Sequence, residues 1–507
     1  MTKMSTGAAA LAVLTLTVLA GCASDTPQAP STDLTIVLAT EPVSLDPCDT
    51  QDAANAVVLR SNVTESLTRI DPASGEVVPV LAESWEQKDD TTWTFALREG
   101  VTFQDGTPFD ADAVVASIAR VTDADLNCQN LDQFPNALTV TAVDPLTVEI
   151  ASAVPDSILP LRISYADISA PSTPTDAKTS EPIGTGPFAF ESREQGTSVD
   201  LVRYDDYWGE APAATSVTYV YRAEPSVRAG MATTGEASIA TQISVQDATD
   251  DDRTREYNDN RVFFLRTPTE KAPFDDIRVR QAAQLAIDKE TIVGALMERS
   301  GVPADQILVE TVNGYVPGYT APSFDLEKAK DLLADAKADG VAVDTAFDLV
   351  TRPDLFPGSD EVIQAIHQNL QDAGFSVNIL SLDTDAWLQL LRAPFPADQK
   401  PNIIAISHDN VSGDSSFSLP KYIGSEGANS TVRNAEIDRL LAEAEAAVGD
   451  ERASLYEGAA RVLYEEVGAY IPIALQSKLI MLADGVEYEP TGLTGVELRI
   501  SDITFTN

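Results

Sequence analysis

Residues able to carry out covalent chemistry are scarce in this sequence. A hydrolase needs a nucleophile with a base within reach, and the chain holds only two histidines, His367 and His408. His367 shares an apolar-periodic stretch with Ile363 and Ile366, which predicts a surface position on a helix. The sequence contains no G-x-S-x-G, no glycine-rich phosphate loop, no C-x-x-C and no H-E-x-x-H. We therefore expect no catalytic centre, no cofactor and no protein-only metal site.

Binding chemistry is better represented, beginning with a polar stretch in the C-terminal half. Residues 403–406 predict a short buried strand, and the mostly polar residues 407–417 follow it. In open α/β sheets, ligands bind beyond the carboxyl ends of the strands. His408, Asn410 and Asp414 are the candidate ligand-binding residues in this stretch. The alternative is a plain solvated loop.

Arg352 is a candidate of the opposite charge. It follows a predicted strand at 347–350, so it also lies at a strand end. The planar guanidinium group can donate two parallel hydrogen bonds, which suits a carboxylate of a ligand. A structural salt bridge explains the residue equally well.

The elements that must position these residues alternate between strands and helices. Predicted strands at 347–350, 375–379 and 403–406 alternate with helical patterns at 362–370 and from Trp387 onward. Such alternation predicts an α/β fold with a partly parallel sheet that is covered on both faces. A chain of 507 residues exceeds what one hydrophobic core usually serves, so at least two domains are expected.

The charge of the chain excludes one class of partner. With 34 basic and 79 acidic residues the formal net charge is −45, and such a surface repels nucleic acid. The acidity fits a secreted, soluble protein. A mild preference for cationic solutes is a second explanation, although surface carboxylates are usually just solvated.

One long stretch identifies a family. Residues 181–209 read EPIGTGPFAFESREQGTSVDLVRYDDYWG, in which Gly184 and Gly186 predict a tight turn before a β-hairpin. The run G-T-G-P-F followed by R-Y-D-D-Y-W-G closely resembles the signature of the bacterial extracellular solute-binding proteins of family 5. These are the dipeptide-, oligopeptide- and nickel-binding components of ABC importers.

Further blocks extend the resemblance over nearly all of the mature chain. Residues 38–47, LATEPVSLDP, resemble the first strand of the family and the loop that reaches its cleft. Residues 273–282, PFDDIRVRQA, resemble the start of a helix in the second lobe. Residues 235–240, GEASIA, resemble the family's G-E-x-D-I-A, with Ser238 in place of the usual aspartate.

The resemblance implies a periplasmic-binding-protein-like fold of class II, with two lobes, a central cleft and an extra N-terminal subdomain. The expected boundaries are a signal peptide at 1–21, a tether at 22–32, lobe I at 33–52, 181–266 and 476–507, the subdomain at 53–180, and lobe II at 267–475.

The resemblance also implies ligand-binding residues. In the peptide binders an acidic residue of the loop after the 403–406 strand holds the ammonium group of the substrate, often within D-N-G-D-P-D. Here Asn410 and Asp414 keep part of this run, while the proline is missing and His408 is added, which puts a plain dipeptide preference in doubt. On the opposite lobe, Glu41 follows the first strand, and Thr241 and Gln242 follow the strand that ends the G-E-A-S-I-A run.

The N-terminus predicts an extracytoplasmic address. Lys3 precedes an apolar run, 8–20, that is too short to span a bilayer. The run ends in Leu-Ala-Gly-Cys, which resembles a bacterial lipobox and makes Cys22 the expected lipidation site. An ordinary cleaved signal is the alternative. No later stretch of the sequence is long and apolar enough to predict a transmembrane helix.

The two remaining cysteines fit the same compartment. Outside the cytoplasm, Cys48 and Cys128 are expected to form a disulfide that closes a loop of 80 residues. Two separate buried thiols are the alternative.

The resemblance implies capture and delivery as the function. We expect a monomer, anchored to the membrane by lipid, that closes its lobes on a small peptide or peptide-like solute and docks on the transmembrane subunits of an ABC permease. A nickel chelate, an opine or a sugar-derived solute are alternatives within the same mechanism. An extracellular hydrolase and a surface receptor are alternatives from other classes.

Overall fold

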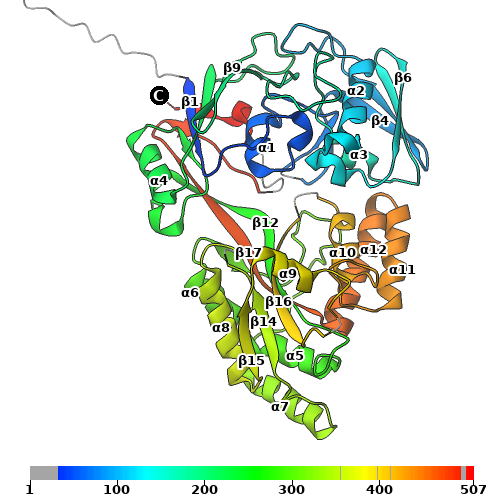
Figure 1. The fold of residues 1–507 in the computed structure, drawn as a ribbon, viewed down its shortest axis with the longest axis vertical. Helices are drawn as coiled ribbons and strands as arrows, with labels where there is room; N and C mark the ends of the chain where they lie inside the picture. Colours follow the sequence, from blue (N-terminus) through cyan, green and yellow to red (C-terminus); the bar gives the residue numbers. More distant parts are fainter. Residues whose placement is uncertain are drawn as a thin grey trace, which may run out of the picture.

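Two lobes joined by two long strands make up the molecule. The computed structural model describes residues 32–506 except 73, 250, 354, 397, 411–412 and 493–497. The predicted signal peptide, Cys22 and nearly all of the tether lie outside the described residues. Strands β12 (Thr254–Arg266) and β17 (Tyr470–Leu482) pair antiparallel and run from the upper lobe into the lower one (Figure 1). We call the upper lobe, which holds both ends of the described chain, lobe I, and the lower one lobe II.

One large sheet runs through both lobes. Its strand order is β15-β14-β16-β12-β17-β11-β1-β10-β9-β8, and β13 also pairs with β17. Parallel pairs, such as β1 with β10 and β14 with β16, occur in each lobe, while the pairs at the hinge are antiparallel. The lobe I strands are β1 (Asp33–Leu38), β8 (Phe188–Glu194), β9 (Ser198–Arg203), β10 (Ser216–Tyr221) and β11 (Ile239–Ala240); those of lobe II are β13 (Gly301–Pro303), β14 (Phe347–Thr351), β15 (Val377–Ser381) and β16 (Asn402–Asp409).

Helices cover both faces of the sheet in lobe II, as the alternating pattern predicted. Side chains alternate along a strand, so Phe263 and Leu265 of β12 join one core while Val262 and Phe264 join the other. The first core is closed by α5 (Ile277–Ala286), α6 (Lys289–Leu296), α7 (Leu326–Ala338) and α8 (Ser359–Asp372). The second is closed by α9 (Thr384–Leu391), α10 (Leu419–Ile423), α11 (Ala435–Ala446) and α12 (Gly449–Val462).

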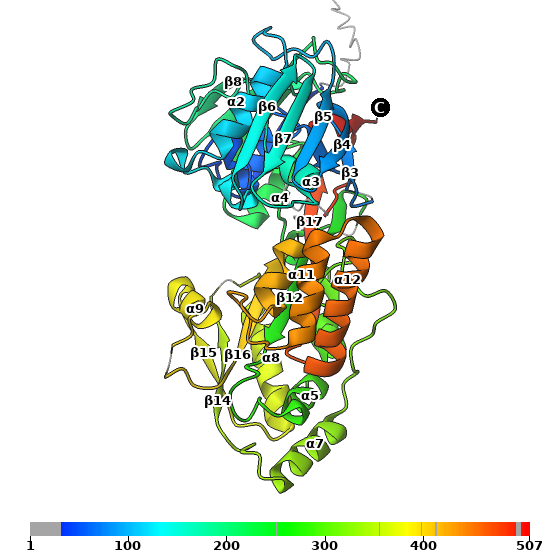
Figure 2. The same cartoon turned by 90° about the vertical axis from the view of Figure 1, so that its right-hand side faces the viewer.

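A smaller sheet with its own core forms the predicted N-terminal subdomain beside lobe I (Figure 2). Its strand order is β4-β5-β7-β6, all antiparallel, and it faces the viewer in Figure 2. The residue boundaries of the domains stay a prediction. Elements here are β2 (Thr68–Ile70), β3 (Val77–Pro79), β4 (Ala82–Asp89), β5 (Thr92–Leu97), β6 (Leu138–Asp144), β7 (Thr147–Ser152), α2 (Ala111–Val121) and α3 (Leu159–Ile163); lobe I adds α1 (Ala53–Leu59) and α4 (Pro225–Thr234).

The hairpin predicted from residues 181–209 is confirmed as β8 and β9, and its glycines are sterically required. A Cβ atom at Gly184 would lie 2.2 Å from the carbonyl oxygen of Val63, and one at Gly186 would lie 2.5 Å from that of Asn62. Both distances are far below van der Waals contact. The turn before the hairpin therefore presses its backbone against the segment that follows α1.

The aromatic end of the same motif holds a buried carboxyl group. Oε1 of Glu65 accepts a hydrogen bond from the Tyr207 hydroxyl (2.9 Å), and Oε2 accepts from the Trp208 indole (2.8 Å) and the Thr185 hydroxyl (2.8 Å). Burial raises the pKa of Glu65 to about 7, against the lowering effect of these donors. The family signature thus fastens the large sheet of lobe I to the segment that leads into the subdomain.

One predicted strand differs in length from the observed one. Strand β16 was expected to end at 406 but continues to Asp409, because its last residues pair with β12 across the hinge.

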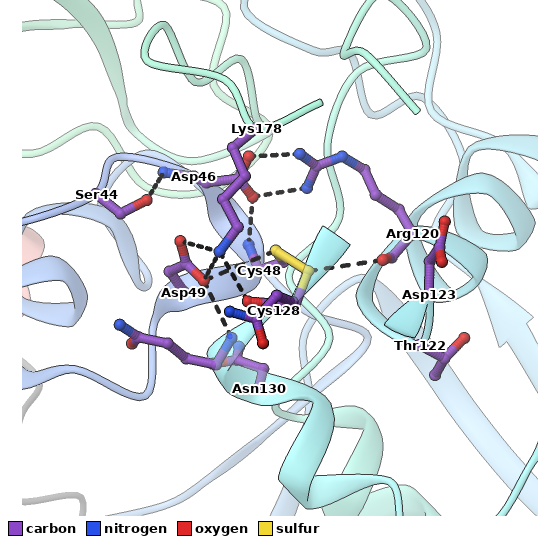
Figure 3. Close-up of a disulfide and its surroundings, with 12 residues drawn as sticks. Ser44, Asp46, Cys48, Asp49, Arg120, Thr122, Asp123, Cys128, Asn130 and Lys178 are labelled. Carbon is purple, nitrogen blue, oxygen red and sulfur yellow. Dashed lines mark hydrogen bonds and ion pairs between the residues drawn. A yellow bond between two sulfur atoms is a disulfide. The ribbon is translucent and has the colours of Figure 1, made fainter. Parts of the chain in front are cut away.

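The predicted disulfide is present in the structure. Cys48 and Cys128 are bonded at an S–S distance of 2.08 Å, and two ion pairs flank them (Figure 3). Arg120 binds both carboxylate oxygens of Asp46, and Lys178 lies 2.5 Å from Asp49. Together these links fasten the loop after β1 to the N-terminal subdomain.

Candidate binding cleft between the lobes

A depression opens on lobe I next to the hinge. It measures about 700 Å³ including the space open to solvent. It lies at the carboxyl ends of the parallel strands β1 and β11, which is where open α/β sheets bind ligands. Thr40, the two predicted residues Thr241 and Gln242, and the hinge residue Lys478 line it.

A buried arginine behind this depression fixes its floor. Arg228 donates to the carbonyl oxygens of Thr241 (2.8 Å) and Gln242 (2.5 Å), and to those of Arg222 and Ala223 (2.7 Å each). The side chain is 2% exposed. Gln242 has a positive φ of 52°, an uncommon conformation that these hydrogen bonds hold in place.

Glu41 does not share this depression. Its carboxylate accepts hydrogen bonds from Arg193 (2.7 Å) and from the backbone of Gly196 (3.0 Å), both in the β8–β9 hairpin. The hydrogen bond from Arg193 holds the pKa of Glu41 below its ordinary value. Glu41 therefore fastens the loop after β1 to the hairpin, and its predicted ligand contact stays a prediction.

On lobe II, Asp414 is fully engaged by protein groups. Its carboxylate accepts from Arg452 through Nε (3.0 Å) and a terminal nitrogen (2.8 Å), from Asn313 (2.7 Å) and from the backbone of Ser416 (2.8 Å). Burial acts to raise the pKa of Asp414, but the hydrogen bonds and charge of Arg452 outweigh it and leave the pKa below its ordinary value. The structure thus shows Asp414 organising its loop.

His408 and Asn410 belong to one buried hydrogen-bond chain. Nε2 of His408 lies 2.7 Å from the Ser418 hydroxyl, and Ser418 lies 3.4 Å from Oδ1 of Asn410. The backbone N–H of Asn410 donates to Asn260 at the hinge (3.0 Å). Burial lowers the pKa of His408 to about 4, so the imidazole is neutral at pH 7. Both residues join the cleft loop to the hinge.

Sequence reasoning missed the aspartate between these two. Asp409 is the last residue of β16, and its side chain is 44% exposed, against 5% for Asp414. Its carboxylate lies 3.2 Å from Arg261 of the hinge strand β12. Successive side chains of a strand point to opposite faces, so a longer predicted strand would have placed Asp409 on the face opposite to His408. These residues were instead interpreted as a loop.

Arg352 lies at the end of β14, as predicted, and keeps unused donors. Its guanidinium carbon is 5.4 Å from the ring centre of Trp387 on α9. Nε of Arg352 and Nε1 of Trp387 are both buried without a hydrogen-bond partner among the described residues. The salt bridge that was the alternative explanation is not found within the part of the chain that the structure describes.

The lobes touch each other along one edge of the cleft. Phe417 of lobe II packs with Ile70 and Leu161 of the subdomain, and the Arg162 guanidinium lies 5.1 Å from its ring centre. Arg452 also donates to Ser157 of the subdomain (3.1 Å). The loop that contains the candidate ligand residues therefore bears directly on the opposite wall.

Neither a metal cluster nor a membrane span is found in the described ranges. No group of three or more His, Cys, Asp or Glu side chains there is arranged to hold a metal ion. No helix between residues 32 and 506, gaps excepted, is long and apolar enough to cross a bilayer.

Comparisons with known proteins agree with this architecture. The chain is 29% identical over 452 residues to heme-binding protein A of Haemophilus influenzae, covering 81% of each chain. It is 25% identical over 469 residues to the glutathione-binding protein GsiB of Escherichia coli K12, covering 88% of this chain and 89% of the other. The structure of HbpA2 from Haemophilus parasuis superposes with a TM-score of 0.84 at 22% identity, covering 94% of this chain and all of that one.

The model of one protein family covers most of the chain. It is described as the middle region of the bacterial extracellular solute-binding proteins of family 5, and it matches residues 76–429. This match covers more than half of the sequence and includes most of the subdomain, the hinge strand β12 and the candidate residues of lobe II. The chain therefore belongs to family 5 of the bacterial extracellular solute-binding proteins.

Proposed function

We propose that this protein is the substrate-binding component of an ABC importer, and that it captures an oligopeptide or peptide-like solute between its lobes. One observation carries the choice of solute: the lobe II wall offers donors at Arg352 and Trp387 that have no partner among the described residues, and an exposed carboxylate at Asp409. A peptide carries the complementary pair, a carboxylate and an ammonium group. The glutathione-binding relative supports this class, because glutathione is a modified tripeptide.

The residues divide into contact and positioning roles. Arg352 takes the solute carboxylate through its guanidinium fork. Asp409, in place of the buried Asp414, takes the ammonium group. His408, Asn410 and Asp414 hold the loop around Asp409 in position; Thr241 and Gln242 offer polar groups on the lobe I floor, and Glu41 secures the loop beside it.

Closure of the lobes retains the solute without chemical conversion. Strands β12 and β17 cross between the lobes, and their register shifts between Asn258 and Val262, where the pairing is interrupted. Such an irregularity lets the two strands bend together as a hinge. Closure expels water from the cleft and strengthens the polar contacts within it. The closed form then docks on the transmembrane subunits of the permease.

The anchor completes the proposal. Cys22 carries lipid, so the body stays at the outer face of the membrane as a monomer. Incorporation of labelled palmitate into the full chain, lost in Cys22→Ala, tests this step. Labelling that persists in Cys22→Ala overturns it.

The solute is tested by recovering what the protein carries. The full chain is extracted from membranes in detergent and denatured, and the released small molecules are identified by mass spectrometry. A released peptide, together with loss of peptide binding in Arg352→Met, supports the proposal. A metal chelate, an opine or a sugar conjugate keeps the transport role and overturns the peptide assignment. Cleavage products of an added peptide show a hydrolase instead.

A further inference from the structure

Basic side chains without a carboxylate partner among the described residues gather around α9 and α10 of lobe II. Acidic residues outnumber basic ones by 79 to 34, so a basic side chain in this protein readily finds an acidic partner. Arg266, Arg352, Arg392 and Lys421 nevertheless form no ion pair within the described ranges. A concentration of unpaired positive charge at the cleft is the opposite of what the composition predicts.

The backbone holds two of these cations as neighbours. Arg266 is buried and donates to the carbonyl oxygens of Leu391 (2.8 Å) and Asn429 (2.5 Å), which joins the end of α9 to the segment after α10. The Asn429 N–H in turn donates to the carbonyl of Lys421 (2.9 Å). Arg392, directly after α9, and Lys421, in α10, are therefore held near each other by the hydrogen bonds that Arg266 donates to both segments.

Lys421 is the partly desolvated member of this pair. It is half-buried, and its Nζ lies 5.8 Å from the ring centre of Tyr422. Its ammonium group makes no hydrogen bond or ion pair with another described residue. Burial, followed by the charge of Arg392, lowers its pKa, and the carboxylates of Asp409 and Asp132 only partly oppose this effect. A partly buried cation without a counter-ion is unfavourable, and an anion placed beside it removes the penalty.

The charge of Lys421 is also felt by the opposite wall of the cleft. Asp132 belongs to a short 3₁₀ helix of the N-terminal subdomain (Gln129–Gln133), and its charge acts on Lys421 across the gap between the lobes. The nearer carboxylate, Asp409, is already paired with Arg261. The position open to a solute thus has positive charge on the lobe II side.

From this cluster we infer that Lys421 and Arg392 form a second anion subsite, which takes an acidic group of the solute other than the carboxylate held by Arg352. The inference rests on the proposed function and narrows it. The solute is an acidic peptide or peptide-like molecule with at least two anionic groups. The group that fits this subsite is a carboxylate at the end of a short side chain.

Tripeptides that differ in one charge test this inference directly. The probes are Ala-Ala-Ala, its three single-glutamate forms and Ala-Lys-Ala, with affinities measured by calorimetry on the full chain in detergent at fixed ionic strength. We expect the best glutamate peptide to bind about tenfold more tightly than Ala-Ala-Ala, the effect of one charge-assisted hydrogen bond. Lys421→Met should remove this preference, whereas Lys328→Met, which removes an exposed lysine on α7 far from the cleft, should leave it unchanged.

A pairing of Lys421 with Asp132 on closure is the competing explanation, and Asp132→Asn separates the two. An anion subsite predicts equal or tighter binding of the glutamate peptide in this variant, because a repelling carboxylate is removed. Pairing on closure predicts weaker binding of all peptides alike, which would overturn the inference.

Failure of the peptide assignment is distinguished by a second probe. If no tripeptide binds, melting temperature is measured with glutarate and with its uncharged diamide. Stabilisation by glutarate alone, lost in Lys421→Met, sustains the subsite while the peptide assignment fails. Equal effects of glutarate and diamide, or a neutral tripeptide that binds as tightly as the acidic ones, overturn the subsite.

Discussion

The two walls of the cleft use the same residue type in opposite ways. In lobe I, Arg228 is buried and spends its guanidinium group on four backbone carbonyls, which shapes the floor around Gln242. In lobe II, Arg352 is held against Trp387 and keeps a buried donor without a partner in the described chain. An arginine whose donors are all used can only support the site. A buried arginine donor without a partner is unfavourable, and a ligand that accepts its hydrogen bond removes this penalty.

The acidic residues repeat this contrast within one loop. Asp414 is saturated by Arg452, Asn313 and a backbone amide, while Asp409, five residues earlier, is exposed and paired only at the hinge. The wall of lobe I and the base of the lobe II loop are therefore structural support, whereas the surface of lobe II presents Asp409 and Arg352, which can still form hydrogen bonds with a ligand. Variants should divide accordingly into those that change stability and those that change affinity.

Removal of the disulfide should give the largest effect and confine it to the scaffold of lobe I. For the double variant Cys48→Ala/Cys128→Ala we expect the free energy of unfolding to fall by about 4–5 kcal/mol, because the bond closes a loop of 80 residues in the unfolded chain. Urea denaturation measures the loss. The affinity of the folded protein for its solute should change little; a loss of affinity at full stability would break the division between the walls.

Asp414→Asn tests the scaffold of lobe II. The variant leaves Arg452 buried without its counter-ion, which should cost about 3–5 kcal/mol of unfolding free energy. Asp339→Asn is the matched control: this aspartate is 69% exposed and pairs with Arg278 on the surface, so its loss should cost less than about 1 kcal/mol. If Asp414→Asn kept wild-type stability and lost only ammonium-bearing solutes, Asp414 would be the contact residue in place of Asp409.

A buried carboxyl group of lobe I should also make stability depend on pH, in the direction opposite to that of the buried His408 in lobe II. The pKa of Glu65 is about 7 in the folded protein against 4.5 for a free side chain, because burial disfavours the charged form. Its contribution is fully present below about pH 4.5 and is lost as the pH rises through 7, a change of up to about 3 kcal/mol. Glu65→Gln cannot ionise and should not undergo this loss, so its stability should increase relative to that of the wild type as the pH rises over this window.

The control for Glu65 is a carboxyl group whose pKa is shifted the other way. The pKa of Glu41 lies below its ordinary value, so Glu41 stabilises the fold above its unfolded pKa and loses that effect in acid. Glu41→Gln should therefore leave the profile between pH 5 and 8 unchanged. An equal change of both variants in the dependence of stability on pH would show that this dependence does not come from Glu65.

The sequence alone predicted the scaffold better than the site. Glycine turns, the alternating strands and helices, and the pair Cys48–Cys128 follow from local rules, and a family signature combined them into the two-lobed fold. The site depends on which polar groups remain unsatisfied, and that is decided by partners far away in sequence. Nothing near Asp414 in the sequence indicates Arg452, 38 residues later, and nothing near Lys421 indicates that its ammonium group has no counter-ion among the described residues.

The most important residue that sequence reasoning missed, Asp409, was missed because its strand is longer than predicted. Asp409 was read as part of a loop because the apolar run ends at Ile406, yet β16 continues through pairing with β12. Such pairing is a tertiary effect that sequence periodicity does not contain. Arg352 was found because a cation at a strand end is a local signal, although only the structure shows that it forms no salt bridge with a described residue.

Arg352→Met gives the smallest effect and addresses the comparison most directly. The variant keeps an unbranched apolar side chain against Trp387 but removes the donors that have no described partner, so unfolding free energy should change by less than about 1 kcal/mol. Affinity for a carboxylate-bearing solute should fall by about tenfold or more, which corresponds to the loss of a charged hydrogen bond of about 1.5–3 kcal/mol. Calorimetric titration on the full chain measures this ratio, and Arg439→Met, an exposed arginine on α11 with only surface partners, should leave it unchanged. A large loss of stability with unaltered affinity would place Arg352 in the scaffold with Arg228. The contrast between a satisfied and an unsatisfied arginine would then fail at the residue that defines it.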